Sequence, residues 1–131
     1  MSYQKNILEA TRNNTNFRTV LFTGKKSQLV VMDIKPGEEI GLETHDNVEQ
    51  TLFFLSGIAK AILDGQESEV NAGDVVVVTP GTVHNFINTG TETLKVYTIY
   101  APANHIDGRI HKTPQEAIAD QADEDFGHHV V

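Results

Sequence analysis

Hydrophobic and polar positions alternate in short runs from residue 18 to residue 100, and turn-forming residues separate these runs. Short alternating runs bounded by Gly, Pro, Asn or Asp are typical of β-strands in a barrel or sandwich. The pattern therefore predicts an all-β domain built from antiparallel strands. The predicted strands are Arg18–Thr23, Gln28–Ile34, Gln50–Leu55, Ile58–Leu63, Glu67–Val70, Val75–Val78, His84–Asn88 and Leu94–Tyr100.

Two short segments add detail to this pattern. Asp64-Gly65 stands between two predicted strands and indicates a tight hairpin, because Gly accepts the positive φ of such a turn. The run Val75–Val78 is apolar at every position, which predicts a strand that is covered on both sides. One side would face the barrel interior, and the other would face a partner surface or a second sheet.

The two ends of the chain differ from its middle. Apolar Ile7-Leu8 and Phe17 predict an N-terminal arm that packs on the barrel. Thr113 followed by Pro114 is typical of an N-cap and first helical position, so we expect a short helix to about Gln121. We expect the acidic segment from Asp123 to Val131 to be mobile.

Composition limits the classes of protein that the chain can represent. Its 131 residues suit a single domain, with the barrel at about 17–101 and the C-terminal loop, helix and tail at 102–131. No apolar run approaches the roughly 20 residues needed to span a bilayer, and the first residues do not resemble a secretory signal. We therefore expect a cytoplasmic protein without membrane contact. A net charge of −8 argues against nucleic acid as a partner.

Two histidines stand in recognisable sequence frames. The frames are Gly37-x5-Glu43-Thr44-His45-x4-Gln50-x6-Gly57 and Gly73-x5-Thr79-Pro80-Gly81-x2-His84-x3-Asn88. Together they resemble the two motifs of the cupin superfamily, in which three histidines and one glutamate hold a divalent metal inside a small jelly-roll barrel of two antiparallel sheets. The chain departs from that pattern at Glu43, which replaces a His, at Gln50, which replaces the Glu, and at Thr79, which replaces a Pro.

The resemblance implies that Glu43, His45, Gln50 and His84 converge in one cavity. The chain has no cysteine, so a metal would need imidazole and oxygen ligands. Two imidazoles and one carboxylate form the facial triad that holds metals such as Fe or Mn and leaves positions open for a ligand. We expect one divalent transition metal, with Fe, Mn, Ni and Zn all open. Gln50 could add a neutral oxygen or bond to a metal-bound ligand, and Gln50 or Glu43 could act in catalysis.

Spacing leaves two candidates for the position after His45. Counting forward from His45 in the family motif also allows Glu49, whereas counting back from Gly57 selects Gln50. One residue of strand register moves a side chain to the other face, so both cannot point inward. Because Leu52 alternates with Gln50, we favour Gln50 inside. Glu49 would then lie on an outer face that could form a homodimer surface.

The barrel alone does not choose a reaction. A metalloenzyme acting on a small oxygen-bearing metabolite, by dioxygenase, isomerase or lyase chemistry, is the first hypothesis. The segment from Leu94 to His111 also resembles small cupins of the mannose-6-phosphate-isomerase-like kind. The alternatives are a cupin that binds a sugar or effector with metal optional or absent, and a barrel with an idle pocket.

Several other residues stay open from sequence alone. His105 and His111 lie in a loop that could reach the barrel mouth. Arg18 could face the cavity and hold an anionic substrate, or could form an outward salt bridge. Tyr97 and Tyr100 lie on opposite faces of one predicted strand, and at least one should pack in the core.

Overall fold

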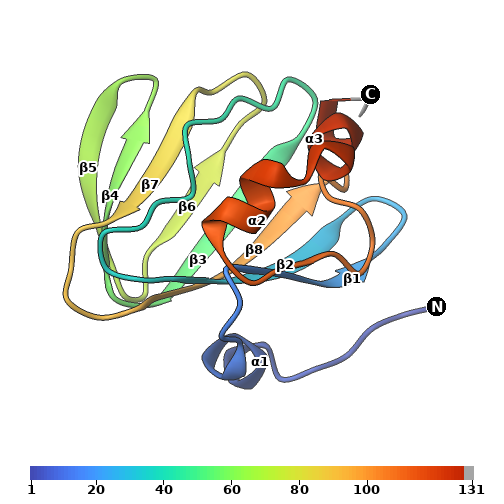
Figure 1. Cartoon of the computed structure of the whole chain (residues 1–131), viewed down its shortest axis with the longest axis horizontal. Helices are drawn as coiled ribbons and strands as arrows, with labels where there is room; N and C mark the ends of the chain where they lie inside the picture. Colours follow the sequence, from blue (N-terminus) through green and yellow to red (C-terminus); the bar gives the residue numbers. More distant parts are fainter. Residues whose placement is uncertain (129–131) are drawn as a thin grey trace.

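The computed structural model describes residues 1–128, and Figure 1 shows their arrangement. The elements in chain order are α1 (Ile7–Asn13), β1 (Arg18–Thr23), β2 (Gln28–Ile34), β3 (Glu49–Ser56), β4 (Ile58–Leu63), β5 (Gln66–Asn71), β6 (Val75–Val78), β7 (His84–Asn88), β8 (Leu94–Ala101), β9 (Ile110–His111), α2 (Pro114–Ala119) and α3 (Gln121–His128). None of the helices in this part of the chain has the length and hydrophobicity needed to cross a membrane.

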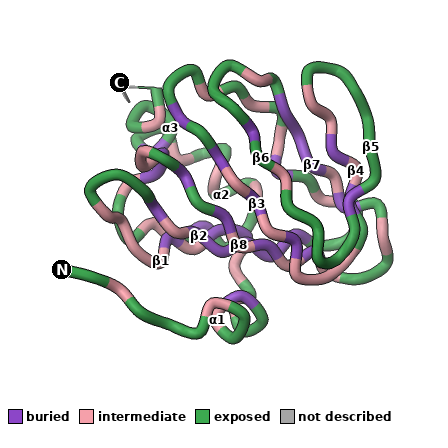
Figure 2. Tube along the Cα trace, turned by 180° about the vertical axis from the view of Figure 1, so that it is seen from behind, coloured by how far each residue is buried: buried purple, intermediate pink, exposed green. Residues whose placement is uncertain are grey.

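The strands form two antiparallel sheets that enclose one apolar core. The larger sheet has the order β6-β3-β8-β2-β1-β9, and the smaller has the order β5-β4-β7. Strand β8, late in the sequence, therefore lies between β3 and β2. Buried positions concentrate along β2, β7 and β8, whereas β5 is almost entirely exposed (Figure 2). The prediction of an all-β jelly-roll barrel of two antiparallel sheets is confirmed.

Strand β3 shows how alternation sets the register. Gln50, Leu52 and Phe54 are each at most 2% exposed, while Glu49 on the opposite face is exposed. Successive side chains of a strand point to opposite faces, so one apolar face fixes the direction of every other residue. The prediction that Gln50, and not Glu49, faces inward is confirmed.

Two turns need backbone that most residues avoid. Asp64 and Gly65 have φ values of 49° and 82°, and Leu63 pairs with Gln66, so the predicted tight hairpin is confirmed. Gly57 has a φ of 90°, and a Cβ built there would lie 3.1 Å from Cα of Leu94. Gly57 thus permits both the turn and the close passage of the neighbouring chain.

The strand Val75–Val78 differs from expectation. It is an edge strand, and Val75 and Val77 are 53% and 52% exposed. The option that a second sheet covers its outer side is wrong, because the smaller sheet covers only the inner side of the barrel. The other option, a partner surface on this face, stays a prediction.

The ends of the chain carry more regular structure than predicted. The N-terminal arm contains helix α1, which lies on the opposite side of the larger sheet from α2 and α3 (Figure 1). Strand β9 was not predicted. It pairs with β1 and begins the C-terminal segment.

The C-terminal helices also refine the prediction. The side chain of Thr113 accepts a hydrogen bond from the backbone N of Glu116, as an N-cap does, and α2 ends at Ala119. The expectation of a mobile tail from Asp123 onward is wrong as far as residue 128. These residues form α3, anchored by the buried carboxylate of Asp123. Residues 129–131 lie outside the described part of the chain.

Candidate metal centre

Three of the four predicted ligands meet at one point of the barrel. A ligand atom from each of Glu43, His45 and His84 lies within 4.8 Å of the other two. Backbone pairing brings them together: Glu43 and His84 exchange two N–H···O bonds of 2.9 Å, so their side chains project to the same side. The backbone N of Gly81 donates to the carbonyl of His45 at 2.8 Å and fixes the third residue.

The tautomer of His84 follows from its neighbour. Nδ1 of His84 lies 2.9 Å from the carbonyl oxygen of Thr82. A carbonyl can only accept, so Nδ1 carries the proton and Nε2 presents a bare lone pair. That Nε2 atom is buried and makes no hydrogen bond with any described residue. A histidine held through one nitrogen by a backbone carbonyl, with the other nitrogen free, is the usual state of a metal ligand.

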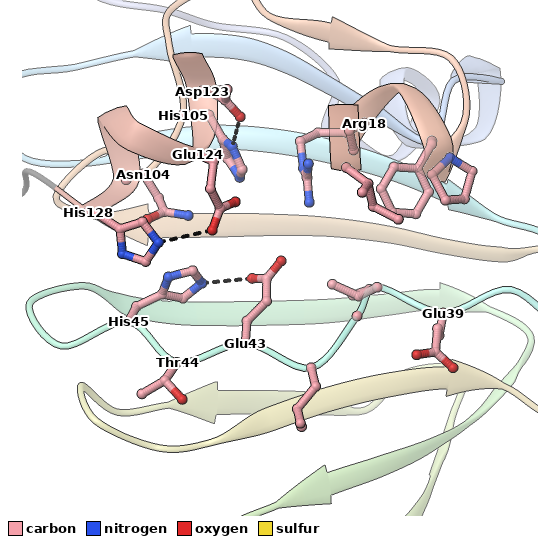
Figure 3. Close-up of a pocket in the computed structure, with 18 of the residues that line it drawn as sticks. Arg18, Glu39, Glu43, Thr44, His45, Asn104, His105, Asp123, Glu124 and His128 are labelled. Atoms are coloured by element: carbon pink, nitrogen blue, oxygen red, sulfur yellow. Dashed lines mark hydrogen bonds and ion pairs between the residues drawn. The ribbon is translucent and has the colours of Figure 1, made fainter. Parts of the chain in front are cut away.

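His45 and Glu43 approach each other in a way that also suits a shared ion. Nε2 of His45 is buried and forms an ion-pair contact of 2.9 Å with Oε2 of Glu43, drawn as a dashed line in Figure 3. Ligands at about 2.1 Å from one metal and at right angles to each other are separated by about 3 Å. The separation of these two atoms therefore matches that of adjacent ligands on one ion.

The charges of the site favour its ligating forms. Burial alone raises the pKa of the Glu43 carboxyl, but His45 and the nearby Arg18 outweigh it, so the pKa lies below its ordinary value. Burial lowers the pKa of His84, which keeps its ring neutral. An ionised carboxylate and the neutral ring of His84 are donors that suit a divalent transition metal.

Gln50, the fourth predicted ligand, points inward from β3. It is 2% exposed, and its amide nitrogen donates to the hydroxyl of Thr98 at 3.2 Å. That hydroxyl donates in turn to the carbonyl of Thr51. These two hydrogen bonds fix the orientation of the Gln50 amide. Gln50 is not among the side chains that line the cavity described next.

A cavity of about 820 Å³ is lined by Glu43 and His45 and has two unlike walls. The first wall is the loop 37–47, which carries Glu43 and His45. The second wall is formed by Arg18 from β1, by Asn104 and His105 from the loop after β8, and by helices α2 and α3 (Figure 3). The structure thus places Arg18 and His105 in the cavity, where the sequence had left both positions open.

One residue of the second wall, Asp123, was not foreseen. Asp123 was assigned to a mobile tail, yet it is buried and bonds to His105. Tyr100 is 1% exposed, and its ring packs against His45 and His105 with centroid distances of 6.3 and 5.0 Å. The alternation along β8 predicted an inward position for one tyrosine. No local pattern pointed to Asp123, because its partner lies 18 residues earlier.

A second cluster of potential ligands fastens the C-terminal segment instead. His111, Asp120 and Asp123 lie close together, but their atoms are already engaged. Asp120 accepts from His111 at 2.9 Å and from Arg109 at 2.8 Å, and these two donors lower its pKa strongly. We therefore assign this cluster to holding α2 and α3 against the barrel.

Comparison with known proteins agrees with this architecture. The family model described as Cupin domain matches residues 30–100. The chain is 42% identical over 120 residues to the uncharacterized protein YrkC of Bacillus subtilis, and the match covers 87% of the chain but only 64% of that protein. A protein of Acanthamoeba polyphaga mimivirus, also described as uncharacterized, is 38% identical over 82% of the chain and 70% of its own length.

A solved structure extends the comparison to three dimensions. The crystal structure of BH2720 from Bacillus halodurans superposes with a TM-score of 0.89 and is 35% identical, covering 91% of this chain and 95% of that one. Residues 30–100, which match the family model, include both histidine frames and all the strands from β3 to β7. The family model, the relatives and the two-sheet barrel agree, and the chain belongs to the cupin family.

Proposed function

We propose that the protein holds one divalent transition metal on Glu43, His45 and His84 and uses it to bind a small oxygen-bearing metabolite. The observation that carries this proposal is the convergence of two buried imidazole nitrogens with one carboxylate, where Nε2 of His84 makes no hydrogen bond with a described residue. Burying Nε2 of His84 without a partner costs free energy, which an ion would offset. Fe, Mn, Ni and Zn all suit this donor set.

The residues of the chain would prepare the site before any ligand enters. Thr82 fixes the tautomer of His84, and the backbone pairing of Glu43 with His84 fixes the spacing. Gln50 would supply a neutral oxygen or a hydrogen bond near the ion, with its amide held by Thr98. A bound metal would supply Lewis-acid chemistry. The cavity volume falls in the range of about 300–1,000 Å³ typical of small-molecule sites.

Metal analysis of protein purified without chelator tests the proposal. We expect about one metal per chain in the wild type, and loss of the metal in His45→Ala and His84→Ala without loss of the fold. Gln50→Ala should keep the ion with weaker affinity. Glu49→Ala is the matched control, because this carboxylate is exposed on the face of β3 opposite Gln50 and does not line the cavity.

Two outcomes would contradict the assignment. Full metal content in His45→Ala would show that the ion lies elsewhere. A wild-type protein that carries no metal and binds none added would favour the alternative, a cupin that binds its ligand with protein groups alone. Assays of product formation with the loaded protein would then separate dioxygenase, isomerase and lyase chemistry from binding without turnover.

We also propose that the protein forms a homodimer through the outer face of the larger sheet. Val75, Phe53 and Tyr97 lie in one row across β6, β3 and β8, and the rings of Phe53 and Tyr97 stack at 4.8 Å. Val77 and Ile99 continue this apolar surface in the next row and are both exposed. A second copy would cover it. Light scattering should give a dimer at micromolar concentration and a monomer for Val77→Lys; a monomeric wild type would contradict the proposal.

A further inference from the structure

Arg18 is a buried cation without an acidic partner. It is 4% exposed, its Nε makes no hydrogen bond, and no carboxylate within residues 1–128 forms an ion pair with it. Nη1 lies 3.3 Å from Nδ1 of His111, which must accept because a guanidinium only donates. The guanidinium carbon also lies 5.2 Å from the ring centre of Phe17. Neither contact neutralises the charge.

A buried guanidinium normally requires a paired anion, because its desolvation is otherwise costly. The charge of Arg18 lowers the pKa of Glu43, but the ion-pair partner of Glu43 is His45 and not Arg18. Figure 3 shows Arg18 pointing into the cavity from the wall opposite Glu43 and His45. The planar fork of donors matches a carboxylate, which it can bind through two parallel hydrogen bonds.

His105 adds an acceptor to the same wall. Its Nδ1 lies 2.7 Å from Oδ2 of Asp123, so the carboxylate holds the proton on Nδ1. Its Nε2 is buried, makes no hydrogen bond with a described residue, and points toward the cavity in Figure 3. Burial lowers the pKa of His105, and the charge of Arg18 lowers it further. The neutral ring therefore offers a lone pair that can accept a hydrogen bond from a hydroxyl group.

We propose that Arg18 and His105 form a recognition site for a small hydroxycarboxylate, whose carboxylate binds Arg18 and whose hydroxyl donates to Nε2 of His105. The inference rests on the proposed function only for the metal that would face the ligand from the opposite wall. A single cation suits a monoanion. A phosphate, with nearly two charges, would be repelled by the acidic residues of the cavity, which include Glu38, Glu39, Asp46 and Glu124.

Binding of lactate and of propanoate, which lacks the hydroxyl, tests both contacts by calorimetry. The titrations use the full chain, first stripped of metal with chelator and then reloaded. Wild-type protein should bind lactate about 3- to 10-fold more tightly than propanoate, the range of one hydrogen bond. Arg18→Gln should weaken the binding of both acids by about 10-fold or more. Arg12→Gln, a change at an exposed arginine in α1, should leave the binding of both acids unchanged.

His105 is tested by two replacements of different reach. The amide nitrogen of His105→Asn takes the place of Nδ1 and keeps the bond to Asp123, but removes Nε2; lactate should then bind no better than propanoate. His105→Gln reaches the position of Nε2 and should restore part of the preference. If Arg18→Gln fails to fold, Arg18→Lys keeps the charge but lacks the paired donors of the guanidinium, and it should still weaken the binding of both acids.

The results separate this inference from the proposed function. Arg18→Gln that binds both acids like the wild type would overturn the inference, as would a wild type that binds neither acid in either state. If metal loads normally in that case, the metal centre stands and only the recognition site fails. If the stripped protein binds lactate through Arg18 and takes up no metal, the recognition site stands and the metal centre fails.

Discussion

Replacing Asp123 by Asn tests how the C-terminal helix is held over the cavity. The carboxylate of Asp123 accepts hydrogen bonds from Nδ1 of His105 and from the backbone N of Ile106, both at 2.7 Å. Asn has the same shape but only one acceptor oxygen. If that oxygen keeps the bond to Ile106, the amide NH₂ faces the N–H of His105, and the ring must move its proton to Nε2 to relieve the clash.

The size of the effect follows from these two contacts. Burial alone raises the pKa of Asp123, but His105 and the backbone N of Ile106 outweigh it, so the pKa lies below its ordinary value and the folded state favours the ionised form. A hydrogen bond to a charged group contributes about 1.5–3 kcal/mol, and the variant loses one of the two. We expect a loss of about 2 kcal/mol in the free energy of unfolding. For a chain of 131 residues this corresponds to a fall of about 7 °C in Tm.

Urea and thermal unfolding of metal-free protein measure this loss, with Asp107→Asn as the control. Asp107 is exposed in the same loop, so its replacement changes the net charge equally without removing a buried contact. Nitrogen-15 spectra of the histidine rings report the tautomer directly. The reasoning is refuted if Asp123→Asn unfolds within about 0.5 kcal/mol of Asp107→Asn.

Three further outcomes follow from the structure. Burial lowers the pKa of His84 and of His105, so the unfolded chain takes up protons at a higher pH than the folded chain. The free energy of unfolding of metal-free protein, measured by urea titration, should therefore fall as the pH drops below about 6.5. A free energy that does not change with pH would contradict this. Gly57→Ala should lose about 2–3 kcal/mol in the same assay, because its φ is positive and its Cβ would crowd Leu94, whereas Gly90→Ala should lose less than about 1 kcal/mol. A divalent metal at about 100 times its Kd should raise the free energy of unfolding by about 2.7 kcal/mol, and a thermal shift that persists in His84→Ala would place the ion elsewhere.

The barrel could be predicted from local patterns because strands alternate with a period of two. The bounds of β1, β2, β4, β6 and β7 are the same as those of the predicted strands. The inward direction of Gln50 followed from Leu52 two residues later. Helix α1 gave no comparable signal, because it is only seven residues long and its one buried residue is Thr11. Short helices of this kind depend on packing against the rest of the protein, which the local sequence does not encode.

Some residues of the candidate site could also be predicted from local patterns, and others could not. Glu43, His45 and His84 could be proposed because two spaced motifs carry them, and the structure brings them together. Arg18 shares a face with the buried Val20, which was the available sign that it points inward. Asp123 lies in an acidic, polar segment that is typical of a solvated tail. Its burial depends on His105, and a pairing over that distance leaves no periodic trace in the sequence.

The place of β8 in the larger sheet has a consequence for how the chain acquires its structure. Its backbone pairs with β3 on one side and β2 on the other, so the sheet stays in two unconnected parts until residues 94–101 have been synthesised. Contacts between segments so far apart in sequence slow the folding of barrels relative to helical proteins. A chain cut after residue 93 would lose the strand that joins the two parts and would expose unpaired edges prone to aggregation. Cotranslational folding of this barrel must therefore finish only after β8 has left the ribosome.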